Sequence, residues 1–108
     1  MGNAGSSYGN FATAVKTGSY TLACQVAREL PRIGLREALQ LTLLAAEKDP
    51  DRYEQMARRW LVRFLEEKRP TLGLVQYVAS GLDRLGLQGP AGFDEDAEAR
   101  LREVAEKL

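Results

Sequence analysis

Residues 35–46, LREALQLTLLAA, set the architecture of this chain. Polar side chains occur at only four of these positions, Arg36, Glu37, Gln40 and Thr42. At about 100° per residue, Leu35 and Leu44 lie on nearly opposite sides of a helix, and other leucines fill the sides between them. A helix that is apolar around most of its circumference is covered by neighbours on several sides, so this pattern predicts the central helix of a bundle.

The residues that follow predict a second long helix packed against the first. Asp49 is a good N-cap, Pro50 suits the first helical position, and Asp51 complements the helix dipole. Apolar side chains then recur with helical spacing at Tyr53, Met56, Ala57, Trp60, Leu61, Phe64 and Leu65. Because only Asp49 separates residues 35–48 from residues 50–68, we expect an antiparallel helical hairpin with Trp60 as a core anchor.

Four shorter helices are predicted around this hairpin. Capping residues and helix breakers place them at residues 10–17, 19–30, 71–86 and from residue 94 onward. The helix at residues 71–86 is expected to bury Leu74, Val75, Val78, Leu82 and Leu85. Gly81 either weakens this helix or lets another backbone approach it. The last helix offers only a narrow apolar stripe, formed by Ala97, Leu101, Val104 and Leu108, and is either a peripheral strut or an interaction helix.

Together these elements predict one all-α domain, a compact bundle of five to six short helices with the antiparallel hairpin at its centre. A chain of 108 residues can bury one substantial core but not two. Residues 1–9, rich in Gly, Ser and Asn, are expected to form a flexible tail. The helical core domain then covers residues 10–86, a linker residues 87–93, and an amphipathic helix residues 94–108.

Part of the sequence resembles a known group of proteins. The runs ELPRIGL at residues 29–35 and EAL at residues 37–39 are followed by Asp51, Arg52, Tyr53, Ala57, Arg59, Trp60, Arg63 and Phe64. In this pattern, residues 18 to about 84 resemble short all-helical actinobacterial proteins of uncharacterised function. The matching residues are mostly caps and core positions, so the resemblance implies the helical fold and no mechanism.

The composition argues against catalysis and metal binding. The chain has no histidine, and Cys24 is its only cysteine, so neither a zinc site, a His-activated nucleophile nor an internal disulfide is expected. Capping explains the carboxylate pair of Asp49 and Asp51, and exposure explains that of Glu66 and Glu67. Cys24 itself suits a small buried apolar position. We therefore expect a protein that is not an enzyme and that carries no cofactor.

The charge balance and the apolar runs limit the partners and the location. Lys and Arg number 15, as do Asp and Glu, whereas dedicated nucleic-acid binders usually carry a positive excess. No apolar run approaches the roughly 20 residues that span a bilayer, and no secretory signal is visible. Residues 1–6 fit an N-myristoylation pattern, but one acyl chain alone binds membranes only marginally. A cytoplasmic protein without membrane attachment is expected.

Two surfaces are candidates for binding a partner. One is the outer side of the helix at residues 50–68, where arginines surround an exposed valine: Arg58, Arg59, Val62 and Arg63. The other is the stripe of the last helix, represented by Leu101, Val104 and Leu108. The simpler interpretation of the first surface is that Arg63 pairs with Glu66 and Glu67 and the other arginines are solvated.

The leading functional hypothesis is therefore a non-catalytic protein–protein interaction module, which is an adaptor, a subunit or a self-associating protein. The alternative is a nucleic-acid-associated regulator that binds phosphates through Arg28, Arg32, Arg36 and the arginines of residues 50–68. Helix-turn-helix readout of DNA is disfavoured, because the helix after the turn is too apolar to present polar side chains to base edges.

Overall fold

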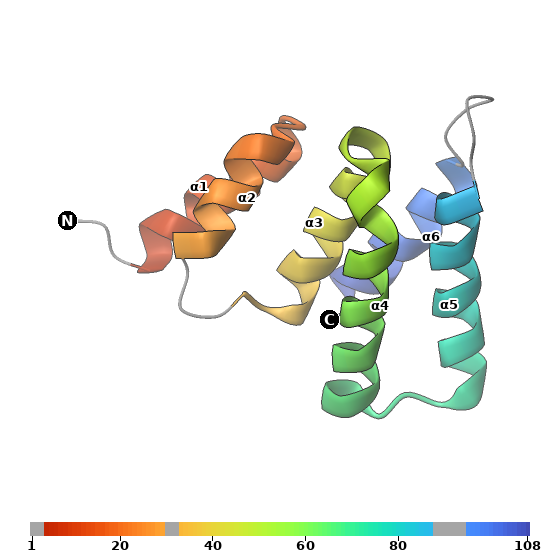
Figure 1. Cartoon of the computed structure of the whole chain (residues 1–108). Coiled ribbons are helices and arrows are strands. Elements are labelled where there is room, and N and C mark those ends of the chain that lie inside the picture. The colour runs from red at the N-terminus through yellow and green to blue at the C-terminus, as the bar shows by residue number, and fades with distance from the viewer. Residues whose placement is uncertain (1–3, 30–32, 88–94) are drawn as a thin grey trace.

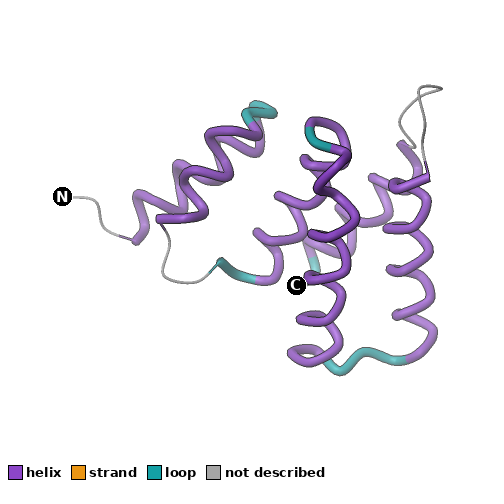
Figure 2. The backbone as a smooth tube through the Cα atoms, viewed as in Figure 1, coloured by secondary structure: helices purple, strands orange, loops and turns teal. Residues whose placement is uncertain are grey.

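The computed structural model describes residues 4–29, 33–87 and 95–108, and this part of the chain consists of helices and short turns without any strand (Figure 2). The predicted all-α fold is confirmed. The helices in the described ranges are α1 (Ala4–Lys16), α2 (Tyr20–Glu29), α3 (Leu35–Lys48), α4 (Pro50–Lys68), α5 (Leu72–Leu87) and α6 (Glu95–Glu106).

The last four helices form a closed unit in which each packs on two of the others. α3 contacts α4 and α6, and α5 contacts the same two helices. In Figure 1, α4 and α5 stand in front of α3 and α6, while α1 and α2 form a hairpin at one side. That hairpin packs on α3, which therefore has neighbours from both parts of the molecule and is the predicted central helix.

The burial of α3 explains this position. Leu35, Leu39 and Leu43 belong to the main core cluster together with side chains of α4, α5 and α6. Leu44, on another side of α3, belongs instead to a second cluster with four residues of the first two helices, Phe11, Ala14, Ala23 and Val26. One helix thus forms the boundary that two separate apolar cores share.

The turn between α3 and α4 lies where the sequence predicts it, but its hydrogen bonds differ from the predicted capping interaction. Asp49 ends α3 and starts α4, and Pro50 occupies the first turn of α4 as expected. The Asp49 carboxylate makes no capping hydrogen bond. It accepts one from the Tyr20 hydroxyl instead, at 3.3 Å, and so connects the turn to α2.

Trp60 anchors α4 to α3 as predicted. Its ring is buried and stacks on Phe64, with the ring centroids 4.9 Å apart. Its indole N–H donates a hydrogen bond of 2.8 Å to the carbonyl of Leu35. The buried indole is therefore satisfied within the core and offers no surface to a ligand.

The first helix corrects one prediction. α1 begins at Ala4 and not at Asn10, so it includes most of the residues expected to be a flexible tail. Gly, Ser and Asn are poor helix formers, which is why composition predicted a tail. Further along the helix, Phe11 and Ala14 are fully buried in the second cluster, and such tertiary packing outweighs weak propensity. Residues 1–3 lie outside the described part.

The ends of α5 and α6 differ slightly from expectation. α5 is capped by Thr71 as predicted, whose hydroxyl accepts a hydrogen bond from the Leu74 amide, but it continues to Leu87, one residue beyond Gly86. Leu74 is 39% exposed and not buried. The rest of the predicted linker, residues 88–93, and the expected cap Asp94 lie outside the described residues, as do residues 30–32.

Candidate interaction surface

The outer side of α4 holds the residues predicted to bind a partner, and they do not act as one group. Arg58 pairs with Glu54 one turn earlier at 2.7 Å, with both side chains about three-quarters exposed. Arg59 is exposed, and Val62 is 54% exposed. A solvated pair of this kind contributes a few tenths of a kcal/mol. Arg59 and Val62 are therefore accessible to a partner, and exposure is the property that supports them as a binding surface.

Arg63 has a structural role. Its Nε donates to Glu67 at 2.9 Å, and a terminal nitrogen donates to the backbone carbonyl of Ile33 at 3.2 Å. The side chain is 29% exposed. Arg63 thus connects α4 to the segment that leads into α3. The pairing with Glu67 follows the simpler interpretation of this surface, and the contact with Ile33 was not predicted.

The stripe of the last helix is the second predicted surface, and burial corrects it. Leu101 is 0% exposed and Val104 is also buried, both within the main core cluster, and Leu108 packs against that cluster while half-buried. A Cβ at Gly81 of α5 would lie 3.2 Å from Leu101, so the glycine allows α6 to approach closely, as one interpretation of Gly81 predicted. These apolar side chains contact the chain's own core.

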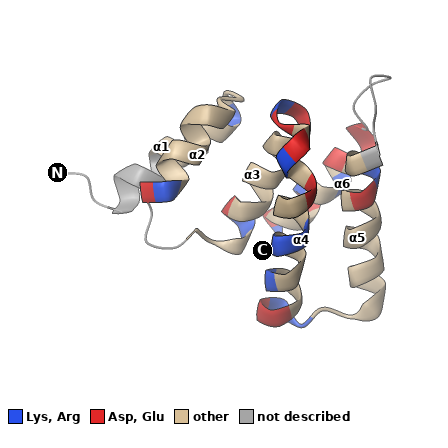
Figure 3. Ribbon diagram, in the orientation of Figure 1, with Lys and Arg blue, Asp and Glu red and all other residues tan. Residues whose placement is uncertain are grey.

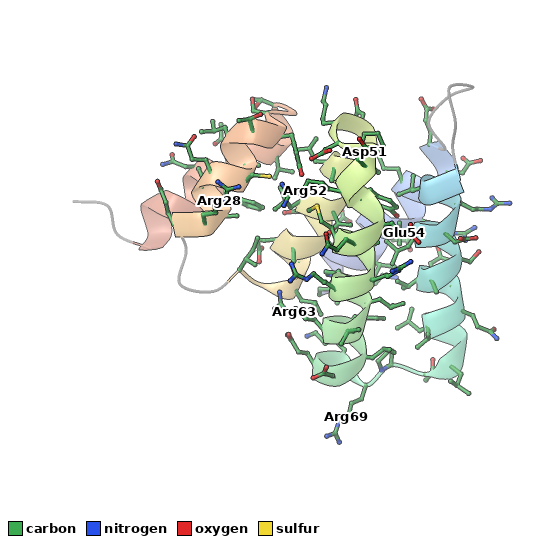
Figure 4. All side chains as sticks on the ribbon, in the orientation of Figure 1. Arg28, Asp51, Arg52, Glu54, Arg63 and Arg69 are labelled. Atoms are coloured by element: carbon green, nitrogen blue, oxygen red, sulfur yellow. The ribbon has the colours of Figure 1, made fainter. Side chains whose placement is uncertain are left out.

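The arginines proposed to bind phosphates are dispersed. Arg36 donates to the carbonyls of Ala105 and Glu106 at 3.1 and 3.2 Å, where it satisfies the end of α6. Arg28 is exposed at the end of α2, and Figure 4 places it on a different element from Arg63. Arg32 lies outside the described residues. Phosphate binding needs adjacent cations that are free of other contacts. Of the described arginines in this set, Arg36 and Arg63 are bound within the chain, whereas Arg28 and Arg59 are exposed on different helices.

The pKa values of two tyrosine hydroxyls are raised well above their ordinary value. Burial, with a smaller effect of the Asp83 charge, raises the pKa of Tyr53, whose hydroxyl donates to the Leu82 carbonyl at 2.6 Å. Burial also raises the pKa of Tyr20, with contributions from Cys24 and then Asp49. Both phenols stay protonated at neutral pH and join helices. Cys24 is half-buried beside Tyr20.

Groups that could hold a metal are missing from the part of the chain that the structure describes. No set of three or more His, Cys, Asp or Glu side chains comes together there. Within the same residues, every buried side-chain nitrogen or oxygen atom has a hydrogen-bond partner. None of the helices searched is long and apolar enough to cross a bilayer.

A groove of about 360 Å³ runs between α4 and α5. Its floor includes the buried Tyr53 and Leu82, and three charged residues, Glu54, Arg58 and Asp83, also line it. The other lining residues are small or apolar: Pro50, Ala57, Leu61, Ala79 and Gly86. This groove has room for one or two side chains of a partner, with charges of both signs beside them.

The least expected surface is the first half of α5. Residues 71–82, TLGLVQYVASGL, contain no charged residue in a chain in which 28% of residues are charged. Figure 3 shows most of α5 without charge, with charged residues only toward its carboxyl-terminal end. Five of its exposed residues form what we call the α5 face, namely Leu72, Gly73, Gln76, Tyr77 and Ser80. Leu72 is 82% exposed and Tyr77 is 42% exposed.

Sequence reasoning missed the α5 face because it considered only the residues of this helix expected in the core, and none of the five residues of the face is among them. The available signal was the length of the uncharged run: a surface helix normally carries charges on its outer side. Here Val78 and Leu82 are buried, and the exposed positions on the opposite side of the helix are Gly73, Gln76 and Ser80. Uncharged runs also open α1, at residues 4–15, and α2, at residues 20–27. The run in α5 carries Leu72, which at 82% is the most exposed large apolar side chain of the described residues.

Comparison with known proteins adds no relative to this geometry. No family model, no curated protein and no solved structure matches the chain. The resemblance to short helical actinobacterial proteins therefore stays a prediction.

Proposed function

We propose that this chain is a non-catalytic protein–protein interaction module, acting as an adaptor, a subunit or a self-associating protein, and that it binds through the α5 face. The observation that carries the proposal is apolar surface exposed on a helix that has no charge over its first three turns. Interfaces are depleted of charged residues at their centre and enriched in aromatic ones such as Tyr77.

The neighbouring surface supports this choice. On α4, Leu65 is 41% exposed, and Val62 adds a second accessible apolar side chain. The groove between α4 and α5, which Leu61 and Ala79 line, provides a recess on the same two helices. Large apolar side chains scattered singly are ordinary on protein surfaces, but several on adjacent helices beside a groove are typical of a binding site.

A photoreactive amino acid placed at one position tests the proposal. We would replace Gln76, at the centre of the α5 face, with p-benzoylphenylalanine and irradiate the protein in an extract of its source cells. We expect a covalent protein adduct of defined mass, because a bound partner covers this position.

Matched control variants carry the same group at Gln55, on the outer side of α4, or at Gln25, on α2; both positions are exposed. The proposal expects no adduct from Gln25. An adduct from Gln55 alone would assign binding to the arginine side of α4 and reject the α5 face. The absence of any adduct at Gln76 would also reject it.

A further inference from the structure

We propose that the α5 face binds the same face of a second copy of this chain, with the two α5 helices antiparallel about a twofold axis near Gln76. This inference rests on the proposed function and names the partner. In such an isologous contact each residue at 76 + n lies opposite the residue at 76 − n of the other copy.

The first argument is that none of the five residues of the face is charged; the charged group beside them is the Arg100 guanidinium of α6, 4.7 Å from the centroid of the Tyr77 ring. A surface without charge can meet itself without bringing like charges together, whereas a strongly charged partner would find no complementary group on it. Gln76 at the proposed axis has an amide with both a donor and an acceptor, so two copies related by the axis can exchange a pair of hydrogen bonds. The face is therefore complementary to itself.

The second argument is the placement of the charges at its ends. Arg69 is the exposed C-cap of α4, three residues before α5 begins, and Figure 4 shows its side chain pointing away from the bundle. Asp83 is exposed on α5 eleven residues after Leu72, about 16 Å along the helix. Antiparallel pairing places Arg69 of each copy near Asp83 of the other, whereas parallel pairing would bring like charges together. The neighbouring Arg84 already has an interaction within the chain.

The third argument is Gly73. A Cβ built at this position would meet no atom within 4 Å, so the fold of a single chain does not require a glycine there. Gly81 differs, because Leu101 packs directly against it. Glycine is a poorer helix former than alanine. A glycine exposed beside Leu72 and Tyr77 suits a position where a second helix approaches closely.

Sedimentation equilibrium of the full chain tests this inference. The single-chain mass is 12.0 kDa, and we expect the average mass to rise toward twice that value between about 1 µM and 1 mM, the range for a modest interface. A chain that stays monomeric throughout this range would overturn the inference.

Charge reversal tests the orientation. Asp83→Arg and Arg69→Asp should each weaken dimerisation at least tenfold, and the double variant should recover to within about threefold of the original, because it restores the pairs with their signs exchanged. The matched control Asp51→Arg, also exposed but at the start of α4, should leave dimerisation unchanged. Double reversal that weakens dimerisation further would contradict the antiparallel arrangement. Circular dichroism checks that each variant is folded.

Gly73→Ala separates a role in binding from a role in folding. The added methyl group meets open space in the monomer, so the midpoint of thermal unfolding at low concentration should stay the same or rise. Dimerisation should weaken at least fivefold, because the methyl group enters the contact between the helices. Unchanged dimerisation would place Gly73 outside the interface and count against the proposal.

These results differ from those that test the proposed function. A monomeric chain whose photoreactive group at position 76 labels a different protein would reject the self-association but keep the interaction module. A chain that neither dimerises nor forms an adduct at that position would reject both.

Discussion

The Tyr53 hydroxyl connects α4 to α5 through one short, buried hydrogen bond to Leu82. Tyr53→Phe removes the donor without opening a cavity, and we expect the free energy of unfolding to fall by about 1 kcal/mol. The matched control is Tyr77→Phe, because the Tyr77 ring is 42% exposed and the Arg100 guanidinium lies over its face. Its effect should stay within about 0.5 kcal/mol. Urea denaturation of both variants measures the difference, and equal effects would contradict this role of Tyr53.

The same phenol predicts how stability depends on alkaline pH. Burial raises the pKa of Tyr53 above its ordinary value of about 10, so the unfolded chain releases this proton at a lower pH than the folded chain does. Its contribution to stability is complete below about pH 10 and decreases as pH rises further. Tyr53→Phe should flatten the fall in unfolding free energy between pH 9 and 11. An identical slope in the variant would show that this phenol does not titrate differently on folding.

At this scale, the sequence predicts the residues whose role depends on their own helix. Trp60 is identified as a core anchor from its place in a regular apolar stripe, and Thr71 as a cap from its position before a helix. Contacts between distant residues were not predicted. Arg36 donates to a carbonyl at the carboxyl end of α6, 69 residues away, and Arg63 donates to the carbonyl of Ile33, 30 residues away. No local sequence pattern encodes such pairs.

Among the helices, α6 depends on a contact from outside itself. The guanidinium of Arg36 binds two carbonyls at its carboxyl end, where a cation also complements the helix dipole. Arg36→Met should weaken the last turn of α6 by about 1 kcal/mol, which corresponds to roughly fivefold faster amide hydrogen exchange. NMR-detected exchange measures this. Arg28→Met, at the exposed end of α2, is the control, and equal acceleration in both variants would argue against the contact.

The success of prediction for each helix depends on how strong its local signals are. α4 has a proline at its start and seven apolar residues in register, and its bounds agree with expectation. α1 has glycines and a serine pair, and only its packing against α2 reveals its length. The stripe of α6 is visible in the sequence, but whether it packs within the chain or on a partner depends on the position of Leu101 relative to Gly81 in the fold.

For the molecule as a whole, two core clusters imply two levels of stability. The hairpin of α1 and α2 is held mainly by the small cluster around Leu44. Leu44→Ala removes a buried side chain and should cost about 2–5 kcal/mol. Amide exchange should accelerate strongly in α1 and α2 and less in α4 and α5, because the hairpin opens by itself. Leu22→Ala, on an exposed position of α2, is the control. Uniform acceleration throughout the chain would indicate a single cooperative unit.

The sequence predicts the fold class because a helix that is apolar around most of its circumference must be enclosed, and the central hairpin because only Asp49 separates its two helices. It does not predict the closed arrangement of α3 to α6, which depends on how helices far apart in the chain pair. The α5 face was also missed, because the apolar pattern of this helix was used only to find core positions. Leu74 was expected to be buried, and the fold leaves both Leu74 and Leu72 at the surface.

The place of α6 between α3 and α5 also affects the newly made protein on the ribosome. Leu39 of α3 is translated about 60 residues before Leu101, which shares its core cluster. At 5–20 residues per second, about 3–12 s pass before the covering helix exists. During that interval α3 is not yet covered by α6, and molecular chaperones then have the greatest opportunity to bind its apolar side chains.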